Sequence, residues 1–126
     1  MIVGTGIDIC EVTRIRKALE SAHGARLKER VFTAREIAYS ERKANRFERF
    51  AARFAAKEAG MKALGTGWRR GVTWQDFEVV NLPSGRPTLV LAGRAQEIAV
   101  GMGVQNISLS MTHTADQAMA MVILES

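Results

Sequence analysis

Apolar and polar residues follow two different periods along this chain, and the change of period separates a mainly helical first half from a mainly β second half. Residues 1–9 are rich in β-branched side chains and predict a buried strand. Residues 11–21 place Val12, Ile15 and Leu19 at helical spacing. The second half predicts four strands separated by turn formers, with one short helix between the second and the third; in chain order they are strands 76–82 and 87–91, helix 92–103, and strands 106–113 and 117–124.

The remainder of the first half carries two further helix signals. Residues 27–32 are predicted to form a short helical or irregular piece, which follows a break in the helical pattern. Thr33 and Glu36 have the spacing of a capping box, which predicts that a helix begins immediately after Thr33. The longest helix is predicted over 45–64, because its helical pattern runs to Gly65, a typical residue just past a helix end.

The composition fits one folded unit. A chain of 126 residues that is 47% hydrophobic and has only two prolines predicts a single domain over 1–126. The order of elements predicts an α+β fold, with a long core helix packed on a mainly antiparallel sheet. No apolar run could span a bilayer and no signal-peptide pattern opens the chain, so we expect a cytosolic protein. The single cysteine, Cys10, excludes an internal disulfide and is expected to be a small buried residue.

The positive charge of the chain is regional. The net charge is +5, yet residues 14–53 alone hold twelve Lys or Arg against five Glu. Such a surface attracts polyanions or an acidic protein. A nucleic-acid-binding module is therefore one possible function. A nucleic-acid-binding function would leave the acidic residues described next unexplained. It would also lack aromatic side chains that stack on bases, because Tyr39 is the only aromatic residue in the basic region outside the core pattern.

An acidic residue lies on the apolar side of the longest helix. Projected at helical spacing, Phe47, Phe50, Phe54 and Met61 form one stripe, and Glu58 lies near its middle. Burial of a carboxylate is costly without a partner. The pattern therefore predicts that a salt bridge, a proton or a metal ion neutralises Glu58.

A second acidic residue, Asp8, ends the N-terminal strand. Its neighbours Ile7 and Ile9 are expected to be buried, while the positions on its own face of the strand are glycines. Bare backbone on that face would permit close approach by another group. Because Asp8 lies three residues before Glu11, the interpretation favoured by the residues alone is that Asp8 caps the following helix.

If the two acidic residues meet, they predict a cation site. An ordinary helical ion pair between Glu58 and Lys62 is the simpler alternative for the helix. That pair leaves unexplained why Arg53 and Lys57 also flank Glu58. Magnesium binds one or two carboxylates and completes its shell with water and phosphate oxygens. Asp8 and Glu58, surrounded by these cationic side chains, would suit a diphosphate.

Five segments of the chain match, in order and spacing, the signatures of one family. They are GIDICEVTR (6–14), VFTAREIAYS (31–40), FAAKEAGMKALG (54–65), PSGRP (83–87) and SMTHT (110–114). Together they resemble the 4′-phosphopantetheinyl transferases, and in particular the short, single-domain holo-acyl-carrier-protein synthases. The resemblance covers essentially the whole chain. A small departure is Phe54, where many relatives have tryptophan, and it is expected to affect only packing.

The resemblance implies a reaction and a metal. The family moves the 4′-phosphopantetheine arm of coenzyme A to a serine of acyl carrier protein, which serves fatty acid biosynthesis, and adenosine 3′,5′-bisphosphate is released. It implies that Asp8 and Glu58 bind one Mg²⁺, or Mn²⁺, and that Lys62 binds the diphosphate. The catalytic set would be Asp8, Glu58 and Lys62, with either a metal-bound water or Glu58 as the base.

The resemblance also implies the binding surfaces. The basic first helix would meet the acidic carrier protein through Arg14, Arg16 and Lys17. Like its relatives, the chain would form a homotrimer with active sites between subunits. An inactive relative kept as an interaction protein is disfavoured by the intact acidic pair. The residues expected near coenzyme A are Arg53, Lys57, Lys62, Gly85, Arg86, Pro87 and His113.

Overall fold

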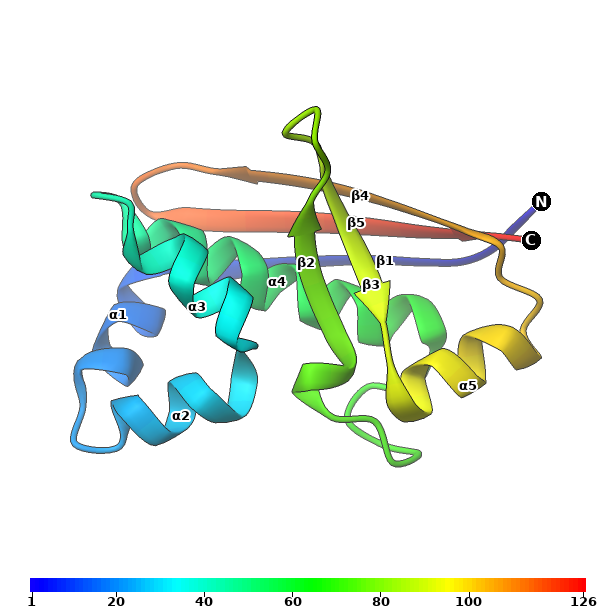
Figure 1. Cartoon of the computed structure of the whole chain (residues 1–126), viewed down its shortest axis with the longest axis horizontal. Coiled ribbons are helices and arrows are strands. Elements are labelled where there is room, and N and C mark those ends of the chain that lie inside the picture. Colours follow the sequence, from blue (N-terminus) through cyan, green and yellow to red (C-terminus); the bar gives the residue numbers. More distant parts are fainter.

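The order of helices and strands confirms the predicted α+β class (Figure 1). The computed structural model describes residues 1–126. No helix is both long and apolar enough to cross a membrane. The elements are β1 (Ile2–Glu11), α1 (Val12–Glu20), α2 (Gly24–Val31), α3 (Ala34–Glu41), α4 (Arg46–Leu64), the 3-10 helix η1 (Trp74–Asp76), β2 (Phe77–Asn81), β3 (Pro87–Leu91), α5 (Gly93–Gly101), β4 (Asn106–His113) and β5 (Gln117–Glu125).

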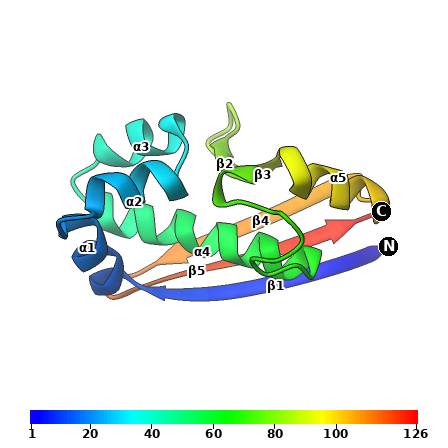
Figure 2. The same ribbon diagram turned by 90° about the horizontal axis from the view of Figure 1, so that it is seen from below.

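The long helix α4 lies between two layers. One layer is an antiparallel sheet of three strands in the order β1-β5-β4. The other consists of the antiparallel hairpin β2–β3 and the helices α2, α3 and α5, on the opposite side of α4 from the sheet (Figure 2). The predicted packing of a long core helix on an antiparallel sheet is therefore confirmed. Because α4 has neighbours on both sides, most of its length is buried, and six of its twelve buried residues are alanines.

Strand β1 approaches α4 so closely that only glycine fits. A Cβ atom at Gly6 would lie 1.9 Å from the Ala59 carbonyl oxygen, and one at Gly4 would lie 2.2 Å from that of Ala63. Both distances are far inside van der Waals contact. The bare face predicted for this strand is therefore the face that α4 covers. Asp8 continues the same face, two residues beyond Gly6.

The expectation that Ile7 and Ile9 are buried was wrong. Their side chains are 56% and 52% exposed. They lie on the face of β1 opposite to α4, and nothing in the chain covers that face. Met121 and Met119, paired with them across β5, are also exposed. The outer face of the three-stranded sheet therefore presents an apolar surface.

The stripe predicted on α4 is only partly buried. Phe50 and Met61 belong to the core, whereas Phe47, Phe54 and Glu58 are half-buried. The helical projection indicated that Glu58 points into the core. In the structure it does not. It lies at the edge of a groove, because short helices rather than a continuous layer cover that side of α4.

The predicted helix boundaries hold at two of three places. Thr33 and Glu36 form the capping box that opens α3, and α4 ends at Gly65 with a φ of 75°. The short helical piece predicted over 27–32 is present as α2, but it begins three residues earlier, at Gly24. A Cβ atom at Gly24 would lie 1.8 Å from the carbonyl oxygen of Leu19, so a glycine allows α2 to start close against the end of α1.

Candidate functional site

The fold brings the acidic residues of β1 and α4 together. Asp8 and Glu58 are both half-buried. Burial raises the pKa of Glu58, and the nearby charge of Asp8 raises it further. Lys62, one turn further along α4, donates hydrogen bonds from Nζ to Asp8 Oδ1 and to the carbonyl oxygen of Ile7, both at 3.0 Å. Two carboxylates and one ammonium group thus share a small volume between β1 and α4.

Both simpler interpretations of these residues were wrong. Asp8 does not cap α1, because β1 continues to Glu11, which is itself the N-cap and has no capping hydrogen bond from its side chain. Glu58 and Lys62 form no ion pair, because the ammonium group of Lys62 reaches across to Asp8 instead. The close approach of β1 to α4 makes this reach possible.

The oxygen atoms of this cluster suit a hard divalent cation. Two carboxylates held close together are stabilised when a cation lies between them. No group of three or more His, Cys, Asp or Glu side chains in the chain could hold a metal ion. A cation at Asp8 and Glu58 would therefore depend on water and substrate oxygens for its other ligands, as Mg²⁺ commonly does.

A mainly apolar groove of about 440 Å³ opens next to Glu58, between α1, α2 and α4. Phe54 stacks on Trp74 with ring centroids 5.0 Å apart, and Trp68 meets Trp74 edge-on at 5.4 Å. These three rings form one wall. Arg14 contributes a cationic edge on the side of α1. The groove therefore offers an apolar surface that ends at the acidic cluster.

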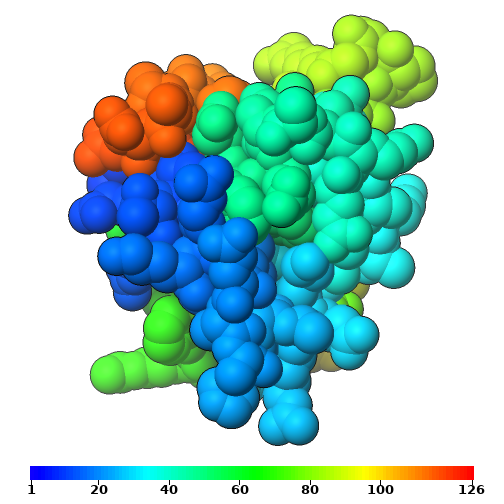
Figure 3. Space-filling view, turned by 90° about the vertical axis from the view of Figure 1, so that its left-hand side faces the viewer, coloured from blue at the N-terminus to red at the C-terminus, as the bar shows by residue number.

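The basic residues of α1 are exposed on the same side of the molecule. Arg14, Arg16 and Lys17 all face solvent. Figure 3 views this side, where α1 (blue) lies beside α2 (light blue). Arg16 covers the ring of Phe47 at 4.9 Å, so its guanidinium group is held against the start of α4.

Lys57 is not available to a ligand, so its predicted contact with coenzyme A is not supported. Its side chain is fully buried, and Nζ lies 2.8 Å from Oε1 of Glu36, which is buried as well. The same nitrogen donates to the carbonyl oxygens of Trp74 and Phe77. Burial lowers the pKa of Lys57, and Glu36 opposes that shift. The pair ties α3 and the start of β2 to α4.

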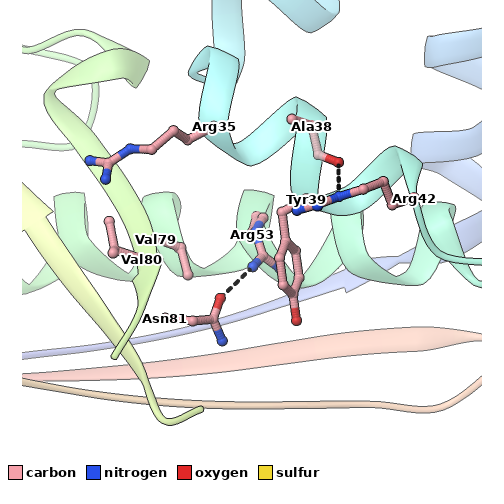
Figure 4. Close-up of a pocket in the computed structure, with 8 residues that line it drawn as sticks. All are labelled: Arg35, Ala38, Tyr39, Arg42, Arg53, Val79, Val80 and Asn81. Atoms are coloured by element: carbon pink, nitrogen blue, oxygen red, sulfur yellow. Dashed lines mark hydrogen bonds between the residues drawn. The ribbon is translucent and has the colours of Figure 1, made fainter. Parts of the chain in front are cut away.

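Arg53 lies beside a basic pocket on the other side of α4 (Figure 4). Its guanidinium group covers the Tyr39 ring at 4.3 Å and donates a hydrogen bond to Asn81 Oδ1 at 3.2 Å. Its Nε is buried without a partner. The pocket has a volume of about 310 Å³ and is lined by Arg35, Ala38, Tyr39, Arg42, Arg53, Val79, Val80 and Asn81. Arg35 is paired with Glu78 at 2.8 Å, so Arg42 and Arg53 supply the positive charge that suits an anion here.

The turn between β2 and β3 borders this pocket through Asn81. Asn81 Nδ2 donates to the carbonyl oxygen of Gly85 at 3.1 Å. Gly85 has a φ of 89°, a conformation that favours glycine. Arg86 and Pro87 follow it directly. The structure thus connects two predicted sets, Arg53 and the turn, through a residue that the sequence did not single out.

His113 lies at the end of β4. Its Nδ1 is 3.4 Å from Oε2 of Glu48, which precedes Arg53 by five residues on α4. The sequence missed Tyr39, Arg42 and Asn81 as candidates. Tyr39 and Arg42 share one face of α3 with Arg35, at spacings of four and seven residues, which was a usable signal. Nothing in the sequence pointed to Asn81.

Comparison with known proteins identifies the family of the chain. A family model described as "4'-phosphopantetheinyl transferase superfamily" matches residues 4–122. The chain belongs to this superfamily. A curated superfamily member from Solibacter usitatus, named holo-[acyl-carrier-protein] synthase, is 63% identical over 126 residues and is covered fully, as is this chain.

Solved structures of superfamily members share the fold. The holo-[acyl-carrier-protein] synthase of Neisseria meningitidis matches with a TM-score of 0.89 and 30% identity, covering 100% of both chains. A holo-(acyl-carrier-protein) synthase of Bacillus anthracis, solved in complex with CoA (3',5'-ADP), matches with a TM-score of 0.81 and 38% identity, covering 100% of this chain and 98% of that one.

Proposed function

We propose that this chain is a holo-acyl-carrier-protein synthase. It transfers the 4′-phosphopantetheine group of coenzyme A to a serine hydroxyl of apo-acyl carrier protein and releases adenosine 3′,5′-bisphosphate, in the service of fatty acid biosynthesis. The observation that carries the proposal is the meeting of Asp8, Glu58 and Lys62 between β1 and α4. Residues 1–126 act as one transferase domain, and its place of action is the cytoplasm.

The acidic cluster would hold the divalent cation of the reaction, Mg²⁺ or Mn²⁺, through Asp8 and Glu58. When bound, such a cation offsets the negative charge that develops on a diphosphate as its bond breaks. Lys62 is half exposed and is held only by Asp8 and one backbone carbonyl. Its ammonium group can therefore turn to a diphosphate oxygen once a cation neutralises Asp8, whose side chain is only 13% exposed. Asp8, Glu58 and Lys62 form the catalytic set.

The nucleotide end of coenzyme A would bind in the basic pocket beside α3. Arg53 carries a positive charge there, with a guanidinium Nε that has no partner. The turn residues Gly85, Arg86 and Pro87 would contact the nucleotide from the pocket rim, and His113 would approach it from the end of β4. Lys57 is left out of this site, because its ammonium group is buried against Glu36.

The carrier protein would bind over α1. Arg14, Arg16 and Lys17 are exposed, and acyl carrier proteins are small, acidic and helical. Opposite charges would steer the two proteins together. Because Arg14 also lines the groove that ends at Glu58, a carrier held on α1 would present its serine toward the acidic cluster.

The outer face of the three-stranded sheet would be the interface of a homotrimer. Ile7, Ile9, Met119 and Met121 form an exposed apolar patch there, which is unusual for a surface that stays in water. Asp8 lies between Ile7 and Ile9 on the same strand, so a neighbouring subunit would come close to the acidic cluster. A molar mass in solution of about three chains would support this assembly, and a mass of one chain would contradict it.

Intact-mass spectrometry tests the proposed activity. Apo-acyl carrier protein is incubated with this protein, coenzyme A and Mg²⁺, and its mass is followed. We expect a gain of one phosphopantetheine group that disappears when EDTA is added. No gain with several different carriers would contradict the proposed function and would favour the nucleic-acid-binding alternative for the basic surface.

A further inference from the structure

Asn81, at the end of β2, joins two parts of the basic pocket that lie far apart in the sequence. Its Oδ1 accepts a hydrogen bond from Arg53 NH2 at 3.2 Å, and its Nδ2 donates to the carbonyl oxygen of Gly85 at 3.1 Å. Figure 4 shows the amide pointing at the guanidinium group from the opposite side to Tyr39. One side chain therefore links the middle of α4 to the turn of the β2–β3 hairpin.

Few other groups hold the guanidinium of Arg53. The side chain is only 3% exposed, one of its faces covers the Tyr39 ring, and Nε has no partner. Asn81 is the only hydrogen-bond acceptor that it reaches. The direction of the guanidinium group therefore depends on a ring face and a single amide oxygen.

The acceptor is neutral, which matters for an anion site. A carboxylate at position 81 would also orient Arg53, but it would cancel the charge that an anion needs. An amide orients the group and leaves its positive charge free. No carboxylate lines the pocket. Arg42 adds further positive charge to it, whereas Arg35 is paired with Glu78 at 2.8 Å.

The turn also depends on Asn81. Within the turn, Leu82 N donates to the Arg86 carbonyl oxygen and Gly85 N donates to that of Leu82, both at 2.8 Å. These bonds shape the turn but do not fix it to the body of the protein, from which the hairpin tip projects (Figure 1). The Asn81 amide adds a link from the Gly85 carbonyl to a residue anchored on α4.

We propose that Asn81 is a positioning residue for the nucleotide end of coenzyme A. It directs Arg53 into the basic pocket and holds the turn at the pocket rim, so that both contact one 3′-phosphorylated nucleotide. This inference rests on the proposed transferase function. Asn81 does not touch the reacting diphosphate, and its effect is confined to binding of the coenzyme.

The test compares coenzyme A with dephospho-coenzyme A, which lacks the 3′-phosphate. For Asn81→Ala we expect the KM for coenzyme A to rise about tenfold, with kcat and the KM for the carrier protein unchanged. The loss of kcat/KM should be clearly smaller for dephospho-coenzyme A, because only the contact of the turn is lost there and Arg53 has no 3′-phosphate to bind. Asn81→Asp should weaken coenzyme A at least as much, although it keeps an acceptor for Arg53.

A matched control is Gln96→Ala, which removes an exposed amide side chain on α5, away from the basic pocket. It should leave both substrates unaffected, and thermal unfolding should show that all variants fold. Equal losses with both substrates in Asn81→Ala, or an unchanged KM for coenzyme A, would overturn the positioning role. A wild-type protein that modifies no carrier would instead overturn the proposed function on which the inference rests.

Discussion

Lys57 and Glu36 form the ion pair of this chain in which both side chains are fully buried. Each partner is also hydrogen-bonded to backbone: Lys57 to Phe77 and Glu36 to the amides of Thr33 and Val79. Such a pair is stable only when it is complete, because a buried charge left alone keeps its full desolvation penalty.

We therefore expect Lys57→Met to lower the free energy of unfolding by about 3–5 kcal/mol, because Glu36 would be left buried without its cation. Denaturant unfolding measures this. The matched control is Lys28→Met, which removes one side of the more exposed pair with Glu41 and should cost no more than about 1 kcal/mol. Equal losses in both variants would contradict the structural role given to Lys57.

Among the elements, the contact between β1 and α4 decides whether the acidic cluster forms. We expect Gly6→Ala to lower both stability and transfer activity, because the new Cβ would lie 1.9 Å from the backbone of Ala59 and would push the strand away from the helix. Asp8 and Lys62 would then separate. Thermal unfolding and the carrier mass assay measure the two effects.

The control for this prediction is Gly101→Ala at the end of α5. A Cβ atom there would meet nothing within 4 Å, and the residue needs no positive φ. Alanine also favours the helix over glycine by about 1 kcal/mol. This variant should be as active as the wild type. If Gly6→Ala behaves in the same way, the close approach of strand and helix does not form the site.

The sequence predicted those elements whose cause is local. The capping box at Thr33, the end of α4 at Gly65 and the bare face of β1 all follow from neighbouring residues. It failed where burial depends on distant parts of the chain. Ile7 is exposed because α4 covers only one face of its sheet.

The same distinction applies to the candidate site. Asp8, Glu58 and Lys62 stood out in the sequence by pattern and by family resemblance, and the structure brings them together. The burial of Lys57 could not be seen, because Glu36 lies on another helix. Asn81 contacts one residue 28 positions earlier, Arg53, and one four positions later, Gly85, and these contacts leave no periodic pattern in the sequence.

For the whole molecule, the basic face over α1 predicts salt-dependent recognition of an acidic partner. We expect Arg14→Glu to raise the KM for the carrier protein far more than the KM for coenzyme A, because it puts a negative charge on the docking surface. Added salt should weaken the wild-type interaction with the carrier in the same way. Steady-state kinetics with each substrate varied in turn measures this, and equal effects on both KM values would contradict the assignment of α1.

The central claim is that Asp8 and Glu58 together hold the cation used in phosphopantetheine transfer. The most direct test follows the carrier mass at increasing Mg²⁺ for the wild type, Asp8→Asn, Glu58→Gln and a control, Glu97→Gln, which alters an exposed carboxylate on α5. We predict that the first two variants lose activity by about 100-fold or more, while the control matches the wild type. Transfer at the wild-type rate by Glu58→Gln, still abolished by EDTA, would show that the cation binds elsewhere and would contradict the account.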